Sequence, residues 1–155
     1  MELSNKILKA ANAVVTFVVA VGFLLAGAYA AYALWDNNTV FAAAGKVQVE
    51  MIRLKPVAET PAEVEASFDE LLAINKDVRA WVTMDNTHID FAVVQGETNL
   101  SYINTDVYGN FALAGSIFLD SRSNGTFHDP YSLLYGHDMV EGKMFGDLVL
   151  YKDAK

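Results

Sequence analysis

The chain has 155 residues, enough for one domain of ordinary size, and it contains no cysteine. Disulfides and thiolate chemistry within this sequence are therefore excluded. Residues 36–155 carry 18 acidic and 9 basic side chains, a formal net charge of −9, which argues against nucleic acid as a partner because nucleic acids attract basic surfaces.

An uncharged, mostly apolar segment of 26 residues runs from Ala10 to Trp35. It exceeds the roughly 20 residues that a helix needs to cross a bilayer. Lys6 and Lys9 precede it and Asp36 follows it, so the positive-inside tendency places residues 1–9 in the cytoplasm. The sequence predicts a cell-membrane protein with a single-pass transmembrane anchor at residues 10–35 and an extracellular domain.

A cleaved signal peptide is the alternative interpretation of this segment. The Ala-Tyr-Ala sequences at 28–30 and 31–33 would suit a signal peptidase. However, the apolar segment is longer than the roughly 7–15 residues of a signal h-region, which favours the anchor. Both interpretations place the remainder of the chain outside the cytoplasm.

Residues 36–60 have no sustained hydrophobic period and are predicted to form a juxtamembrane linker, with at most a short helix or strand near 47–54. A helix is then predicted from residue 61, because Thr60, Pro61 and Glu63 match a capping box with proline at the first helical position. Its apolar face comprises Val64, Phe68, Leu71 and Leu72, and the helix should end near Asn75.

From residue 78 the hydrophobic period changes to two, which indicates strands. Residues 78–95 are predicted to form a hairpin with Asp85–Asn86 in the turn. A loop with about one helical turn (96–106), a strand (115–120), a polar loop (121–130), a strand (131–137) and a helix (141–152) are expected to follow. In that last helix Met144, Leu148 and Tyr151 lie on one side. Residues 61–155 therefore indicate a small α+β or barrel-like domain.

His137 is the histidine with the most suggestive position, because it follows an apolar strand and Gly136. Imidazole is the usual group for proton transfer at neutral pH, although the local pattern alone favours a structural histidine in a turn. His88 and His128 are expected to be exposed strand and loop residues. The spacings of His128 and His137 match no zinc or calcium signature, so neither a metal nor a cofactor is predicted.

Other hydrolytic sites have little support in the sequence. There is no Gly-x-Ser-x-Gly motif, and Ser116 and Ser132 are expected to be ordinary strand residues. Asp120 ends a strand, where a carboxylate commonly caps backbone amides. A carboxylate pair of Asp120 and Asp138 remains open, but no positive feature favours it.

The motifs from Phe68 to Tyr151, taken together and in order, resemble the first half of a class B sortase. They are "FDELLAINKDVRAWVTMDNTHIDFAVVQGETNLSYI", "GSIFLD", "YGHDM" and "MFGDL". The resemblance implies a mainly β fold with α (α+β). It would be a partial sortase-type β-barrel, preceded by an N-terminal transmembrane helix and an amphipathic helix. The incomplete catalytic domain would occupy residues 61–155.

The resemblance also implies an activity. Sortases are cysteine transpeptidases of Gram-positive surfaces. They cleave the sorting-signal peptide near the carboxyl end of a surface protein and pass the resulting acyl group to a peptidoglycan (cell-wall) or pilin amine. His137 matches the catalytic histidine, and Asn99, Ile103 and Tyr135 match residues lining the substrate groove. Thr98 and Ile103 depart from the commoner Asp and Leu, and Asp138 has no implied role.

The cysteine and the arginine of the sortase site belong to later strands, and Arg79 and Arg122 do not stand at the matching arginine position. The sequence therefore predicts a fragment truncated before both residues and inactive alone. Two alternatives are a membrane-anchored, non-catalytic half-barrel that binds peptides or a partner through its strand edges, and a split enzyme whose cysteine comes from a second chain.

Overall fold

The structure, a computed structural model, describes the backbone of residues 2–56 and 61–152 and the side chains of 2–56 and 68–152. The chain divides into two units, residues 1–39 and 40–155, which are described separately. The predicted capping box at Thr60–Glu63 and the apolar position Val64 lie outside the described side chains.

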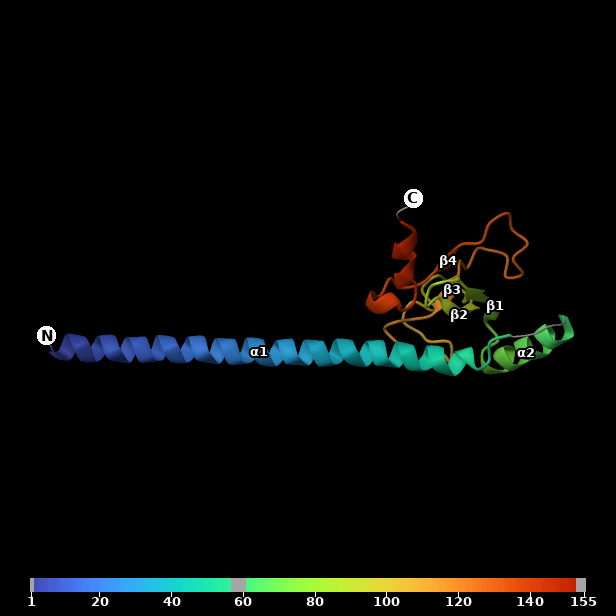
Figure 1. Ribbon diagram of the computed structural model, residues 1–155. Coiled ribbons are helices and arrows are strands. Elements are labelled where there is room, and N and C mark those ends of the chain that lie inside the picture. Colours follow the sequence, from blue (N-terminus) through green and yellow to red (C-terminus); the bar gives the residue numbers. More distant parts are fainter. Residues whose placement is uncertain (1, 57–60, 153–155) are drawn as a thin grey trace. The chain divides into compact units, whose positions relative to one another are not determined.

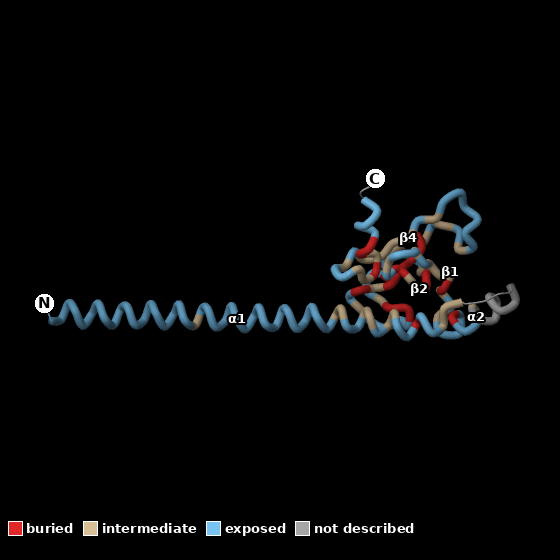
Figure 2. The backbone as a smooth tube through the Cα atoms, in the orientation of Figure 1, coloured by how far each residue is buried: buried red, intermediate tan, exposed pale blue. Residues whose placement is uncertain are grey.

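The first unit consists of the amino-terminal part of helix α1 (Glu2–Ile52) (Figure 1). Almost all of its residues are exposed, and the tube in Figure 2 is pale blue over nearly the whole of this segment. The exposed residues include large apolar ones such as Phe17, Phe23 and Leu24. The helix is long and apolar enough to cross a membrane, by length and composition. This agrees with an apolar helix over residues 10–35, and the anchor itself stays a prediction.

Helix α1 continues to Ile52, so residues 36–52 are helical throughout, whereas the sequence predicted only a short helix or strand near 47–54 in this linker. In the second unit Met51 is buried, and Ala44 and Val47 pack against buried residues of the sheet. Positions 44, 47 and 51 share one helical face, a spacing that the sequence already contained. Extension of an existing helix needs no new nucleus, so a short apolar face suffices to prolong it.

Four strands form one sheet in the order β1-β2-β3-β4. The predicted hairpin is confirmed: β1 (Val78–Thr83) pairs antiparallel with β2 (Asp90–Val94), and Asn86 in the turn has a φ of 60°. Strand β3 (Ile117–Leu119) runs parallel to β2, and β4 (Leu134–Tyr135) pairs antiparallel with β3. The polar loop 121–130 separates β3 from β4 as predicted, although both strands are shorter than expected.

The two central strands, β2 and β3, are buried on both faces. On one face Ala92, Val94 and Phe118 join Met51 and Leu71 in a buried cluster. On the other face Val93, Ile117 and Leu119 pack with Ala114 and Met144. The alternation of side chains along a strand produces both clusters, and Figure 2 shows the buried segments gathered there.

Helix α2 (Pro61–Ile74) matches the predicted helix closely. Leu71 is 0% exposed and Phe68 packs against the same cluster, whereas the neighbouring Leu72 is 40% exposed. The apolar face is therefore narrower than predicted, because Leu72 lies at its margin. The α+β class is confirmed, while the barrel stays a prediction, because the four described strands form a sheet with edges at β1 and β4.

Two predicted helical segments take other conformations. Residues 99–104 form turns, in which the Thr98 and Ser101 hydroxyls bond to nearby backbone N–H groups and compete with helix formation. The predicted helix 141–152 is replaced by two 3₁₀ helices, η1 (Val140–Gly142) and η2 (Gly146–Tyr151). Glu141, Gly142 and Met144 have φ values of 60°, 68° and 52°, which an α-helix cannot accommodate. Met144 is buried, but Leu148 and Tyr151 are exposed.

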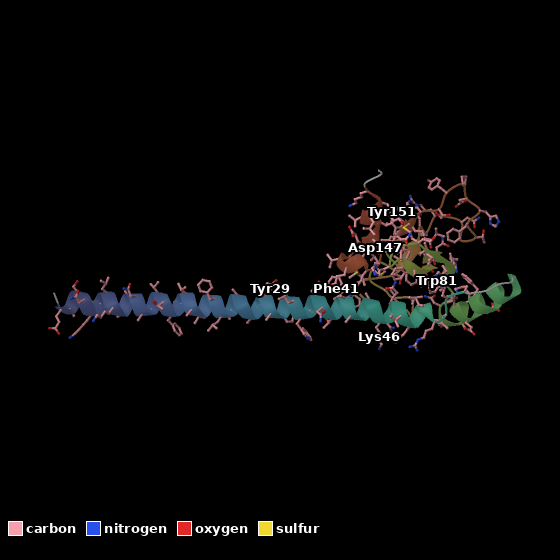
Figure 3. The ribbon with its side chains drawn as sticks, viewed as in Figure 1. Tyr29, Phe41, Lys46, Trp81, Asp147 and Tyr151 are labelled. Carbon is pink, nitrogen blue, oxygen red and sulfur yellow. The ribbon has the colours of Figure 1, made fainter. Side chains whose placement is uncertain are left out.

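Side chains from the end of α1 and the following residues fix this segment to the sheet unit. The Lys55 ammonium lies 2.8 Å from Asp90 Oδ1, which also accepts hydrogen bonds from Trp81 Nε1 and Thr83 Oγ1. The Gln48 side chain donates to the His88 carbonyl, and Lys143 donates to the carbonyl of Phe41 (Figure 3).

The ion pair of Lys55 and Asp90 predicts a pH dependence of stability. Burial alone raises the pKa of Asp90, but hydrogen bonds from Lys55, Trp81 and Thr83 and the Lys55 charge outweigh it, so the pKa lies below the usual 3.8. Because the native pKa is lowered, the stabilisation is complete above about pH 4 and is lost as the pH falls through the native value. We expect Asp90→Asn to cost about 1 kcal/mol at pH 7, after allowance for solvent screening, and less at pH 3.

Thermal unfolding at the two pH values measures this difference. The exposed Asp69 on α2 provides the control, because Asp69→Asn should leave the unfolding temperature unchanged at both values. An equal cost of Asp90→Asn at pH 7 and pH 3 would contradict the assignment.

Candidate active site

His137 lies just after β4, where the backbone at Gly136 passes close to the side chains of Ile117 and Phe145. A side chain on Gly136 would collide with Ile117 Cδ1 and would approach Phe145 Cδ2 to 2.9 Å, so the neighbouring side chains leave little space at the position before His137. The Phe145 N–H donates to the His137 carbonyl at 3.0 Å, which fixes the backbone on both sides of the imidazole. The predicted position of His137 at a strand end is confirmed.

The imidazole of His137 contacts the turn that follows β2. Its Nε2 lies 2.8 Å from the backbone carbonyl oxygen of Ile103. A carbonyl can only accept, so Nε2 carries the hydrogen and Nδ1 is the nitrogen that can accept a proton in the neutral ring. The resemblance implies that Ile103 lines the substrate groove; the residue is 39% exposed, and its backbone carbonyl contacts His137.

Gly115 allows this turn to sit where the Ile103 carbonyl reaches the imidazole. Its φ is +60°, and a Cβ there would collide with the Ile103 carbonyl oxygen and lie 2.7 Å from that of Tyr102. The Ser116 N–H donates to the Tyr102 carbonyl at 3.1 Å. The backbone of the turn at Tyr102 and Ile103 is therefore in direct contact with the backbone of Gly115 and Ser116, which precede β3.

The other two predicted site residues, Asn99 and Tyr135, meet at Asp120. Asn99 Nδ2 and the Tyr135 hydroxyl each donate to Asp120 Oδ2 at 3.0 Å. Asp120 ends β3 and is 3% exposed. The structure thus brings the four predicted residues together as two pairs, with Asn99 and Ile103 on the same turn.

Asp120 is the residue that the sequence did not assign to the site. Its predicted role as a cap is confirmed, because Oδ1 accepts the Arg122 N–H at 2.9 Å. The Arg122 side chain also donates from Nε to Oδ1 at 2.9 Å and from Nη2 to Oδ2 at 2.8 Å. These hydrogen bonds hold the pKa of Asp120 far below its usual range, and the hydrogen bond to Asp120 raises the pKa of Tyr135. The sequence signal for this ion pair was the spacing of Asp120 and Arg122, an acidic and a basic residue two positions apart at the end of a strand.

The two remaining histidines lie away from these pairs. His88 donates its backbone N–H to Asp147 Oδ2 at 2.6 Å, and its Nδ1 lies 2.8 Å from the same oxygen. The backbone hydrogen bond from His88 is the main reason that the pKa of Asp147 lies below 3.8. His88 is exposed as predicted but also joins the hairpin turn to η2, whereas His128 lies in the exposed loop beside Thr126.

Two further features limit what the site can bind. Among the side chains of residues 2–56 and 68–152, no three from His, Cys, Asp or Glu lie close enough to hold a metal ion. A shallow polar hollow of about 520 Å³ includes Arg79, Gln95 and Ser121 in its lining, but none of the four predicted site residues lines it. An imidazole can transfer protons near neutral pH, and this sequence contains no cysteine that could supply a thiol beside His137.

The sequence and the fold of the chain are similar to those of known proteins. No protein-family profile matches it. Sortase B of Listeria monocytogenes is 31% identical over 138 residues, which is 89% of this chain and 56% of the relative. The chain thus spans about half the length of this curated relative.

Solved structures give the same result. A Streptococcus pyogenes class B sortase involved in pilus biogenesis is 56% identical, with a TM-score of 0.52 over 54% of this chain and 46% of that chain. The Staphylococcus aureus sortase B–substrate complex is 28% identical, with a TM-score of 0.53 over 75% of this chain and 51% of that chain. The resemblance predicted from the sequence is confirmed: the chain is related to class B sortases and matches their amino-terminal part.

Proposed function

We propose that this chain contributes the proton-transferring histidine and part of the peptide groove to a class B sortase. Such an enzyme cleaves the sorting-signal peptide of a surface protein and transfers the acyl group of the cleaved protein to a cell-wall or pilin amine. The main support is the position of His137: it follows β4, and its Nε2 contacts the turn that also carries Asn99.

The proposed reaction has two steps. A thiolate attacks the scissile carbonyl, the carbon–sulfur bond forms, and the carbon–nitrogen bond breaks as a proton passes from the imidazole to the leaving amine. The incoming amine then attacks the thioester, gives a proton to the imidazole and releases the thiolate. Because the Ile103 carbonyl retains the hydrogen on Nε2, His137 would exchange its proton through Nδ1. The thiol has to come from outside these 155 residues.

The substrate class follows from the relatives and from the predicted groove. The Staphylococcus aureus sortase B structure is a complex with its substrate. In this chain Asn99, Ile103 and Tyr135 would line the corresponding groove, with two polar side chains already ordered by Asp120. A short extended peptide is therefore the ligand that we propose.

The apolar helix would act as the anchor of the enzyme. Residues 10–35 would span the membrane, with residues 1–9 in the cytoplasm and residues 61–155 as the extracellular part of the catalytic domain. The length of α1 and its unburied apolar side chains support this arrangement.

A chimeric enzyme tests the proposal. The full chain is joined after Lys155 to the carboxyl-terminal part of Staphylococcus aureus sortase B, which supplies the thiol. We expect the chimera, in detergent, to cleave the substrate peptide of the Staphylococcus aureus complex and the 155-residue chain alone to show no cleavage above buffer. Cleavage by the chain alone would contradict the mechanism, and an inactive chimera with a native circular-dichroism spectrum would contradict the function.

The sheet edges favour one other function. Among the described strands β1 and β4 lie at the edges, and an open edge can pair with another chain. A membrane-anchored, non-catalytic protein that binds peptides or a partner would use these edges. This function would be indicated by an inactive chimera together with a chain that binds a peptide or partner and loses that binding when proline is placed in β4.

A further inference from the structure

Three segments that are distant in the sequence converge on the carboxylate of Asp120: the turn with Asn99, the loop with Arg122, and β4 with Tyr135. We infer that Asp120 is a positioning residue for peptide binding. It holds Asn99 so that its amide offers one N–H donor, and it holds Tyr135 so that its hydroxyl offers only an acceptor oxygen. The inference rests on the proposed function, because it assumes that Asn99 and Tyr135 face the peptide.

The orientation of the Asn99 amide is fixed by two different partners. The Ser121 backbone N–H lies 2.7 Å from Oδ1, and an N–H can only donate, so this atom has to be the oxygen. The amide nitrogen then faces Asp120 Oδ2 at 3.0 Å and uses one of its two hydrogens there. One N–H of Asn99 remains for a ligand.

The direction of the Tyr135 hydrogen bond is fixed by the charge of Asp120. The guanidinium of Arg122 holds the pKa of Asp120 far below its usual range, so the carboxylate is ionised and cannot donate. The phenol therefore donates its only hydrogen to Oδ2 at 3.0 Å. A ligand that contacts the Tyr135 oxygen has to bring a donor.

Further contacts hold the side chains and backbone of this cluster in place. The Tyr135 ring stacks on Phe118, with 5.3 Å between ring centroids and an interplanar angle of 29°. Gln95 Nε2 donates to the carbonyls of Asp120 and Ser123 at 3.0 and 2.8 Å, which fixes the backbone that carries the carboxylate. Pre-ordered polar groups lower the entropic cost of binding.

The N–H donor of Asn99 and the acceptor oxygen of Tyr135 determine which ligands can form hydrogen bonds with both residues. A peptide backbone carries alternating carbonyl acceptors and N–H donors, so an extended segment can place a carbonyl at Asn99 and an N–H or hydroxyl at Tyr135. A ligand with only acceptors, such as a phosphate or a carboxylate, matches Asn99 but meets an acceptor at Tyr135. The arrangement therefore favours peptides over anions.

The test compares the full-length wild-type chain in detergent with its Asp120→Asn variant by NMR. In the variant, an amide replaces the carboxylate that accepts hydrogen bonds from Asn99, Arg122 and Tyr135, so we expect the Asn99 side-chain NH₂ resonances to move toward those of a free asparagine. Loss of the negative charge should also lower the pKa of Tyr135 toward 10.0, because Asp120 raises it. The blocked substrate peptide of the Staphylococcus aureus complex should bind about tenfold or more weakly. Asp69→Asn, which also removes one carboxylate, should change none of these values.

Each outcome decides a separate question. Unmoved Asn99 and Tyr135 signals in Asp120→Asn, or moved signals with peptide affinity within twofold of the wild type, would overturn the inference and leave the proposed function intact. A wild-type chain whose Asn99 and Tyr135 signals do not respond to the peptide would contradict the proposed function itself.

A second variant keeps the test decisive if Asp120→Asn does not fold. Tyr135→Phe retains the ring on Phe118 and removes only the hydroxyl. We expect its peptide affinity to fall about threefold to tenfold, the range of one hydrogen bond, while the Asn99 resonances stay near their wild-type positions. Wild-type affinity in this variant would show that the Tyr135 oxygen contacts no ligand donor.

Discussion

Replacing His137 with alanine in the chimeric enzyme is expected to lower kcat by about 10²- to 10⁴-fold, the usual contribution of a positioned acid–base group. The substitution removes the only side chain in the described site that can both accept and donate a proton near neutral pH. Asn99 and Tyr135 donate hydrogen bonds to Asp120, whereas the imidazole contacts the Ile103 carbonyl, so affinity for the peptide should stay within about threefold.

Steady-state kinetics and peptide binding together measure this effect. His128→Ala, which removes an exposed loop histidine, should leave both kcat and affinity unchanged. A His137→Ala chimera that retains more than a tenth of the wild-type kcat would show that another group transfers the proton. Equal losses of kcat and peptide affinity would instead indicate a structural role for His137.

The largest expected effect on stability comes from Leu71→Ala. Leu71 is 0% exposed and lies in the cluster with Met51, Val94 and Phe118, so its truncation leaves a cavity between α2 and the sheet. Such substitutions cost about 2–5 kcal/mol. A domain of this size is stable by about 5–15 kcal/mol, so the variant should lose a large part of its stability.

The adjacent Leu72 provides a matched control for this prediction. Leu72→Ala removes the same atoms from the same helix, but Leu72 is 40% exposed, so the cost should stay within about 0.5 kcal/mol. Urea unfolding can be followed by Trp81 fluorescence in a Trp35→Phe background, since Trp81 packs against the Leu71 cluster. Similar costs for the two leucines would contradict the packing of α2 described above.

The elements that could be predicted are those whose signals lie within a few neighbouring residues. Period-two alternation and the Asp85–Asn86 turn were enough for the β1–β2 hairpin, and 3.6-residue spacing was enough for α2. The continuation of α1 to Ile52 was missed because only Ala44, Val47 and Met51 share the packed face, a pattern too short to stand out. The 3₁₀ segments depend on positive φ values at Glu141 and Met144, which those residue types do not signal.

In the candidate site, too, features signalled by neighbouring residues could be predicted, whereas contacts between distant residues could not. The position of His137 could be predicted because a strand, a glycine and a histidine are consecutive in the sequence, whereas its catalytic role was implied only by the wider resemblance. Its partner could not, because that partner is the backbone carbonyl of Ile103, and every residue has a carbonyl. The role of Asp120 depends on Asn99 and Tyr135, which lie 21 and 15 residues away. Only the path of the chain between the strands brings these groups into contact.

The parallel pairing of β2 with β3 has a consequence for folding kinetics. The hairpin β1–β2 closes through a short turn, but parallel strands require a crossover, here residues 95–116, before their first contact forms. Closing a longer loop costs more entropy, and non-local contacts slow folding. Because Asn99 and Ile103 lie within that crossover, we expect them to reach Asp120 and His137 only after the slowest strand pairing has been completed.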